Sequence, residues 1–158
     1  FERTPDRRDY AVPPSSPSTL TCLQAADIPV VAVGKIEDIF CGQGITHSTH
    51  TKSNAHGLAV MEALVSGDLD WETLALPHVS SHQPASAYDR QLLFINLVDT
   101  DMKFGHRRDV QGYAHALEAI DAGLARMLPQ FTPEDLLLIT GDHGCDPTAP
   151  GSDHTREY

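Results

Sequence analysis

Two short stretches of the sequence place an aspartate close to a histidine. Asp142 and His143 are adjacent and lie between two glycines, and Asp101 precedes His106 by five residues. A further histidine, His154, lies eleven residues beyond His143. Carboxylate oxygens mixed with imidazole nitrogens suit manganese or zinc, whereas a calcium site uses oxygens alone. These five residues are therefore the candidate metal ligands of the chain.

A site of this kind predicts phosphoryl transfer as the reaction class. Two divalent ions about 4 Å apart can hold a phosphate oxygen and an attacking oxygen together, which favours in-line displacement at phosphorus. The alternative is that each motif is ordinary, because an Asp-His pair can form a capped turn and the chain has nine histidines in all. Two Asp/His pairs and a third histidine together favour a metal site over these separate explanations.

Three apolar runs are predicted to be the strands that position these residues. Each has the composition of a strand that is covered on both faces. The runs are 29–33, 92–98 and 136–140. With helices between them, they predict an α/β fold with a mostly parallel sheet flanked by helices. In such sheets ligands bind beyond the carboxyl ends of the strands, and Asp101 and Asp142 each follow one of these ends.

Helices are predicted before and between the strands. Apolar residues recur at helical spacing over 58–65, where Gly67 can end the helix, and over 110–127, where the pattern is amphipathic. Ser18 is a candidate N-cap for a short helix that ends at Ala26. The other segments are predicted to lack regular structure, namely an extended lead-in at 1–17, a loop at 34–54 and a polar loop insertion at 77–90.

Composition narrows the class of protein. The 158 residues are enough for one ordinary domain, and 41% of them are hydrophobic. The chain has 22 acidic and 11 basic residues, and its formal charge of −11 disfavours nucleic-acid binding and is compatible with bound cations. No run approaches the roughly 20 apolar residues of a membrane-spanning helix and no export signal is visible, so a cytoplasmic protein without a membrane partner is expected.

Longer stretches around the candidate ligands resemble the phosphopentomutase family, which belongs to the alkaline phosphatase superfamily. They are NLVDTD at 96–101, FGHRRD at 104–109, TGDHG at 140–144, DHTREY at 153–158 and VGKI at 33–36. The resemblance begins at Arg3 and reaches the last residue, with 77–90 as an insertion. It implies an alkaline-phosphatase-like α/β core, of which these residues would be the incomplete carboxy-terminal part.

The resemblance also implies an activity and a metal assignment. Members of the family interconvert ribose 1-phosphate and ribose 5-phosphate, or their deoxy forms, through a phosphothreonine enzyme with two Mn²⁺ ions. Asp142 and His143 would bind one ion, and Asp101, His106 and His154 would bind the other. The implied partners are a pentose phosphate substrate and a sugar bisphosphate activator.

Two basic residues are further candidates for the same site. The resemblance implies that Arg3 contacts the substrate phosphate, which a planar guanidinium can bind through two hydrogen bonds. The ordinary alternative is a solvated arginine. Lys35 follows a predicted strand and is a candidate to offset charge on the transferring phosphoryl group. His56 stands where the family generally has aspartate, and nothing in the sequence explains this difference.

Other parts of the family pattern lie outside these residues. They are the nucleophilic threonine, a further aspartate ligand and an inserted cap domain, all on the amino-terminal side. The chain alone is therefore expected to be inactive and to need that amino-terminal portion as a partner. Two alternatives stay open: another phosphotransferase of the superfamily, such as a cofactor-independent phosphoglycerate mutase or a phosphodiesterase, and a non-catalytic metal-binding module.

Overall fold

The computed structural model describes residues 11–67 and 89–154, and these fall into two compact units. The sheet unit comprises the described residues up to His50 together with 89–96. The helical unit comprises 51–67 and 97–154. Arg3 and most of the predicted insertion at 77–90 lie outside the described residues. None of the helices in the two described ranges combines the length and the apolar character that a membrane-spanning helix needs.

The sheet unit is built around strand β1 (Val30–Val33). It pairs in parallel with β2 (His47–Thr49) on one side and β3 (Leu92–Ile95) on the other, so the strand order is β2-β1-β3. The four β1 residues are at most 1% exposed. Such complete burial of a short apolar run is typical of a parallel strand covered on both faces. The predicted α/β class and parallel sheet are confirmed.

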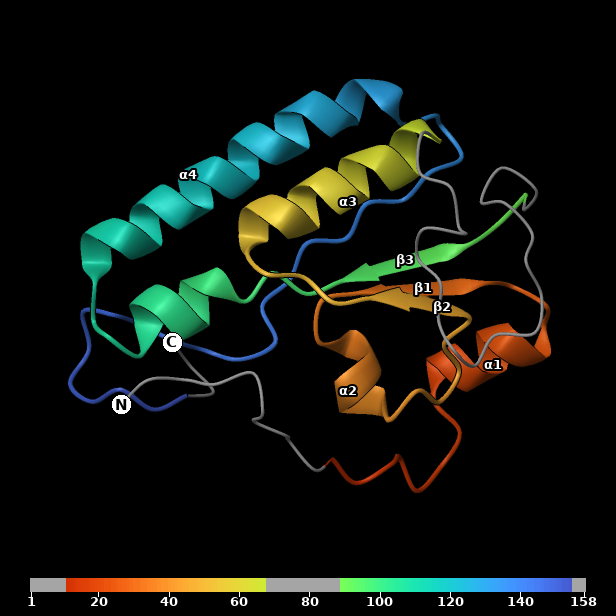
Figure 1. Ribbon diagram of the computed structural model, residues 1–158, viewed down its shortest axis with the longest axis horizontal. Coiled ribbons are helices and arrows are strands. Elements are labelled where there is room, and N and C mark those ends of the chain that lie inside the picture. The colour runs from red at the N-terminus through yellow and green to blue at the C-terminus, as the bar shows by residue number, and fades with distance from the viewer. Residues whose placement is uncertain (1–10, 68–88, 155–158) are drawn as a thin grey trace. The chain divides into compact units, whose positions relative to one another are not determined.

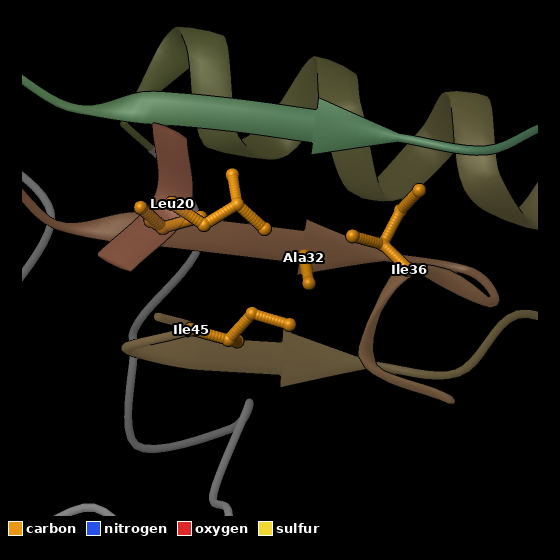
Figure 2. Packing of buried hydrophobic residues seen from close by; sticks show 5 residues of the cluster. Leu20, Ala32, Ile36 and Ile45 are labelled. Carbon is orange, nitrogen blue, oxygen red and sulfur yellow. The ribbon is translucent and has the colours of Figure 1, made fainter. Parts of the chain in front are cut away.

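Two short helices pack at β1 in the same unit, α1 (Thr19–Ala25) and α2 (Ile36–Phe40). The cluster of buried residues that they share with the strand is Leu20, Val30, Ala32, Ile36 and Ile45, whose side chains gather at β1 (Figure 2). The start of α1 is fixed by Ser18, because its Oγ accepts the Thr21 N–H while Thr21 Oγ1 accepts the Ser18 N–H. This is a capping box, and the predicted helix with its N-cap is confirmed.

The loop predicted at 34–54 is partly wrong, because α2 and β2 lie within it. A helix of five residues is too short to be stable by itself, so α2 depends on the burial of Ile36 in the sheet unit. The sequence of β2 is only HST, and pairing with β1 rather than an apolar pattern makes it a strand. Both elements are therefore products of tertiary contact, which local patterns do not reveal.

The helical unit contains α3 (Asn54–Ser66), the π-helix η3 (Thr100–Gly105), α4 (Val110–Met127) and the 3₁₀ turn η4 (Leu128–Gln130) (Figure 1). The two long helices are confirmed, and α3 ends as predicted at Gly67, whose φ is +76°. It begins earlier than predicted, after Ser53, which accepts the His56 N–H at 3.2 Å. α3 and α4 pack closely where Gly123 faces Leu58. A Cβ added to Gly123 would lie only 3.0 Å from the Leu58 methyl carbons.

The strand predicted at 136–140 is not formed. No strand of the described residues pairs with this run, and Leu136, Leu138 and Ile139 are 81%, 78% and 70% exposed. A strand needs a neighbour for its backbone N–H and C=O groups, so an apolar run without a neighbour does not become one. The run predicted at 92–98 is also shortened, because the strand ends at Ile95.

Candidate metal centre

Three of the predicted ligands meet in the helical unit. His154 Nε2 lies 3.1 Å from Asp101 Oδ1 and 3.1 Å from His106 Nε2. His106 Nε2 lies 3.3 Å from Asp101 Oδ1. Ligand atoms that are each about 2.0–2.2 Å from one ion lie roughly 3.0–3.5 Å from one another. The three atoms therefore have the spacing of one face of a coordination sphere.

The π-helix η3 is what brings Asp101 and His106 together. In a π-helix each N–H donates to the carbonyl five residues earlier, and the His106 N–H donates to the Asp101 carbonyl at 3.2 Å. In an α-helix, residues on one face are three or four apart, so a spacing of five would separate the two side chains. The wider winding of η3 thus turns a five-residue spacing into a ligand pair. Sequence reasoning did not predict this element.

Backbone carbonyls fix the orientation of two imidazole rings. His106 Nδ1 is hydrogen-bonded to the Ser152 carbonyl, and His143 Nδ1 lies 3.2 Å from the Gly144 carbonyl. A carbonyl oxygen can only accept, so Nδ1 is the protonated nitrogen in each ring. The Nε2 atom then carries a lone pair, which is the state that binds a metal. The hydrogen bonds therefore prepare both rings to act as ligands through Nε2.

Asp142 and His143 lie beside the first three ligands. The His143 ring stacks on the His154 ring, with 3.7 Å between ring centroids and 19° between planes. His143 Nε2 is 3.6 Å from Asp142 Oδ1. The structure thus brings the predicted residues of both Asp/His motifs and His154 to one place, and their role as metal ligands stays a prediction.

The acidity of this site is reflected in two neighbouring groups that the sequence analysis did not select. Burial raises the pKa of the Tyr113 phenol, and negative charges nearby, among them Asp101 and Asp142, raise it further. Burial also raises the pKa of the Cys145 thiol, helped by a hydrogen bond to Asp101. Carboxylates that make a second negative charge unfavourable make a cation favourable. The only sequence signal for Cys145 was its position directly after the TGDHG motif.

The raised pKa of Cys145 predicts slow alkylation of its thiol. The thiolate is the reactive form, so a pKa above the ordinary value of 9.0 lowers the reactive fraction in mild alkali. The folded state holds this proton more tightly than the unfolded state, so the free energy of unfolding should decrease as pH rises through the raised pKa. Iodoacetamide labelling followed by peptide mass spectrometry tests the rate, with exposed Cys22 and Cys41 as internal controls. Equal rates at all three thiols would contradict the prediction.

The structure describes one of the two basic candidates, Lys35, but not the other, Arg3. Lys35 is an exposed residue of the sheet unit, directly before α2. Arg3 lies outside the described residues. The roles suggested for both residues stay predictions. His56 is exposed on the first turn of α3, where its Nδ1 accepts the Lys52 N–H at 3.3 Å.

Comparison with known proteins defines the class to which this fold and site belong. The model of the Metalloenzyme superfamily matches residues 23–158, so the chain belongs to that superfamily. Among curated relatives, the phosphopentomutase of Anaeromyxobacter dehalogenans (strain 2CP-C) is 46% identical over 158 residues. That of Caldanaerobacter subterraneus subsp. tengcongensis is 47% identical over 159 residues, and that of Hahella chejuensis is 46% identical over 159. Each alignment covers 100% of this chain but 35% of the relative, so the chain spans about a third of their length.

Proposed function

We propose that the chain is the carboxy-terminal part of the metal-binding core of a phosphopentomutase, which interconverts the 1- and 5-phosphates of ribose or deoxyribose. The observation that carries the proposal is the Asp101, His106 and His154 cluster, found in a chain that is 46% identical along its whole length to a phosphopentomutase. The substrate would be a pentose phosphate, and a sugar bisphosphate would act as activator.

The side chains fit the metal that this function requires. Asp101, His106 and His154 would hold one Mn²⁺ ion, and Asp142 and His143 would belong to the second, because one carboxylate with two imidazoles suits a borderline divalent ion. A bound pair of ions supplies charge neutralisation to the transferring phosphoryl group. The chain's own contribution is to hold the ligands, since backbone carbonyls fix the rings of His106 and His143.

The exposed apolar run at 136–140 supports the proposal that the amino-terminal portion of the protein supplies the rest of the core. Leu136 is 81% exposed and Leu138 is 78% exposed, yet the run leads directly to Asp142. Removing apolar surface of this kind from water stabilises the folded protein by about 25 cal/mol per Å². We expect a strand of the amino-terminal portion to pair with it, and the nucleophilic threonine and the cap domain to come from that portion as well.

Two basic residues complete the proposal. Arg3 would bind the phosphate of the substrate through its guanidinium, and Lys35 would offset charge on the transferring phosphoryl group. The role of Arg3 rests on the family pattern, since Arg3 lies outside the described residues. The role of Lys35 rests on its place shortly after the end of β1. A Lys35→Ala variant of an active form with unchanged turnover would exclude the role of Lys35.

A chimeric protein tests the proposal. This chain would replace the matching third of the Anaeromyxobacter dehalogenans phosphopentomutase, and conversion of ribose 1-phosphate to ribose 5-phosphate would be measured with Mn²⁺ present. We expect activity in the chimera, and none in the 158-residue chain alone or in a His154→Ala chimera. A folded chimera that binds Mn²⁺ but has no mutase activity would indicate a non-catalytic module. Turnover of phosphoglycerate instead would indicate a different phosphotransferase.

A further inference from the structure

We propose that Asn54 and Asp99 form a clamp that positions the metal ligands of η3, an inference that rests on the function proposed above. The Asn54 N–H donates to Asp99 Oδ2 at 2.9 Å, and the Asp99 N–H donates to Asn54 Oδ1 at 2.9 Å. The two hydrogen bonds are reciprocal and join residues 45 apart in the chain. They tie the first residue of α3 to the residue that precedes η3.

The clamp is buried, which makes its hydrogen bonds important. Asn54 and Asp99 are each 7% exposed. Asn54 Nδ2 and Asp99 Oδ1 have no hydrogen-bond partner among the described residues, so the two backbone contacts, together with the Lys103 ammonium on Asp99 Oδ2, compensate for burying these polar groups. Removing either side chain leaves a buried N–H of the other residue without its partner, and such a loss is unfavourable.

Close packing beside the clamp leaves little freedom between the two segments. Gly57 lies in the first turns of α3, and a Cβ built there would be 2.8 Å from the Leu97 side chain. Contact of this kind holds the backbone of α3 against the segment that leads into η3. Asp101 follows Asp99 by two residues, so the place of its carboxylate depends on where the clamp fixes the start of η3.

Asp99 of the clamp also binds the ammonium group of Lys103, which could otherwise compete with the metal. Lys103 lies within η3 between two of the proposed ligands, and its Nζ is 2.9 Å from Asp99 Oδ2. An ammonium held by Asp99 is not available to pair with Asp101. The Asp99 carboxylate therefore acts in two ways, by fixing the start of η3 and by binding the lysine. Both make Asn54 and Asp99 positioning residues rather than ligands.

Mn²⁺ affinity of the full chain tests the clamp, measured from the electron paramagnetic resonance signal of free Mn²⁺ during titration. We expect Asn54→Ala to weaken binding by about 10-fold, the lower end of the range found when direct partners of metal ligands are removed, because Asn54 acts on the ligands through Asp99. Ser53→Ala is the matched control, because it removes the N-cap of α3 but neither bond of the clamp. It should lower the melting temperature and leave Mn²⁺ affinity unchanged.

The exchanged pair N54D/D99N separates positioning from general loss of stability. The exchange keeps an acceptor oxygen at both positions, so both backbone hydrogen bonds can form. It is made together with Lys103→Met, because D99N no longer holds that ammonium, and affinity should then return toward that of the parent. A folded exchange variant that binds Mn²⁺ as weakly as Asn54→Ala would overturn the clamp. Unchanged affinity in Asn54→Ala, beside a loss in Asp101→Asn, would overturn the clamp and leave the metal site intact. A parent chain without Mn²⁺ binding, or an unaffected Asp101→Asn, would overturn both.

Discussion

Replacement of His154 by alanine is expected to abolish Mn²⁺ binding at the Asp101, His106 and His154 cluster. His154 Nε2 is the atom 3.1 Å from each of the other two ligand atoms, so its loss opens the site. The loss of affinity should exceed the roughly 100-fold that removal of an outer partner can produce. Isothermal titration of the chain with Mn²⁺ measures it, and affinity of the parent should also decrease in acid because imidazole must be neutral to bind.

His115→Ala is the matched control for this experiment. His115 lies on α4 and is exposed, and the structure records no contact between it and the proposed ligands. We expect the same Mn²⁺ affinity and stoichiometry as in the parent chain. If His154→Ala bound Mn²⁺ as tightly as His115→Ala does, the cluster would not be the metal site. A loss of Mn²⁺ affinity in both variants would instead indicate that surface histidines in general bind the ion.

Gly105→Ala is expected to destabilise the chain and to weaken the metal site together. Gly105 ends η3 directly before His106, and an added Cβ would lie 2.3 Å from Cys145 Sγ and 3.2 Å from the Thr100 carbonyl oxygen. Either Cys145 or the π-helical winding must move to make room. Overpacking of this kind typically lowers the free energy of unfolding by about 1–3 kcal/mol. Urea unfolding and Mn²⁺ titration measure the two effects.

A second substitution tests whether the Cys145 sulfur is the cause. In the double variant G105A/C145A the sulfur is absent, and the remaining Cβ of residue 145 lies 3.5 Å from the added methyl, which is an ordinary contact. We expect most of the lost stability to return. Gly141→Ala is the steric control, because the nearest atom to its added methyl is also 3.5 Å away. A double variant no more stable than Gly105→Ala would contradict this explanation.

The amino-acid sequence by itself determined the elements whose signals are local. The capping box at Ser18, the apolar run around Val31 and the helix-ending Gly67 act within a few residues, so their helices and strand could be predicted. The two Asp/His motifs were also visible in the sequence. The rule that ligands lie beyond the ends of parallel strands led to the prediction of a common site, but 136–140 is not a strand, so this rule does not account for the place of Asp142.

Only the tertiary structure decided the winding, pairing and contacts on which the site depends. The π-helical turn between Asp101 and His106 has no local pattern, and the bonds between Asn54 and Asp99 join segments far apart in the chain. The apolar run at 136–140 was predicted as a strand and is not one, because pairing needs a neighbour that the described residues do not supply. Periodicity reports which face of an element is apolar, whereas register and hydrogen-bond partners are set by segments that meet only in the folded chain.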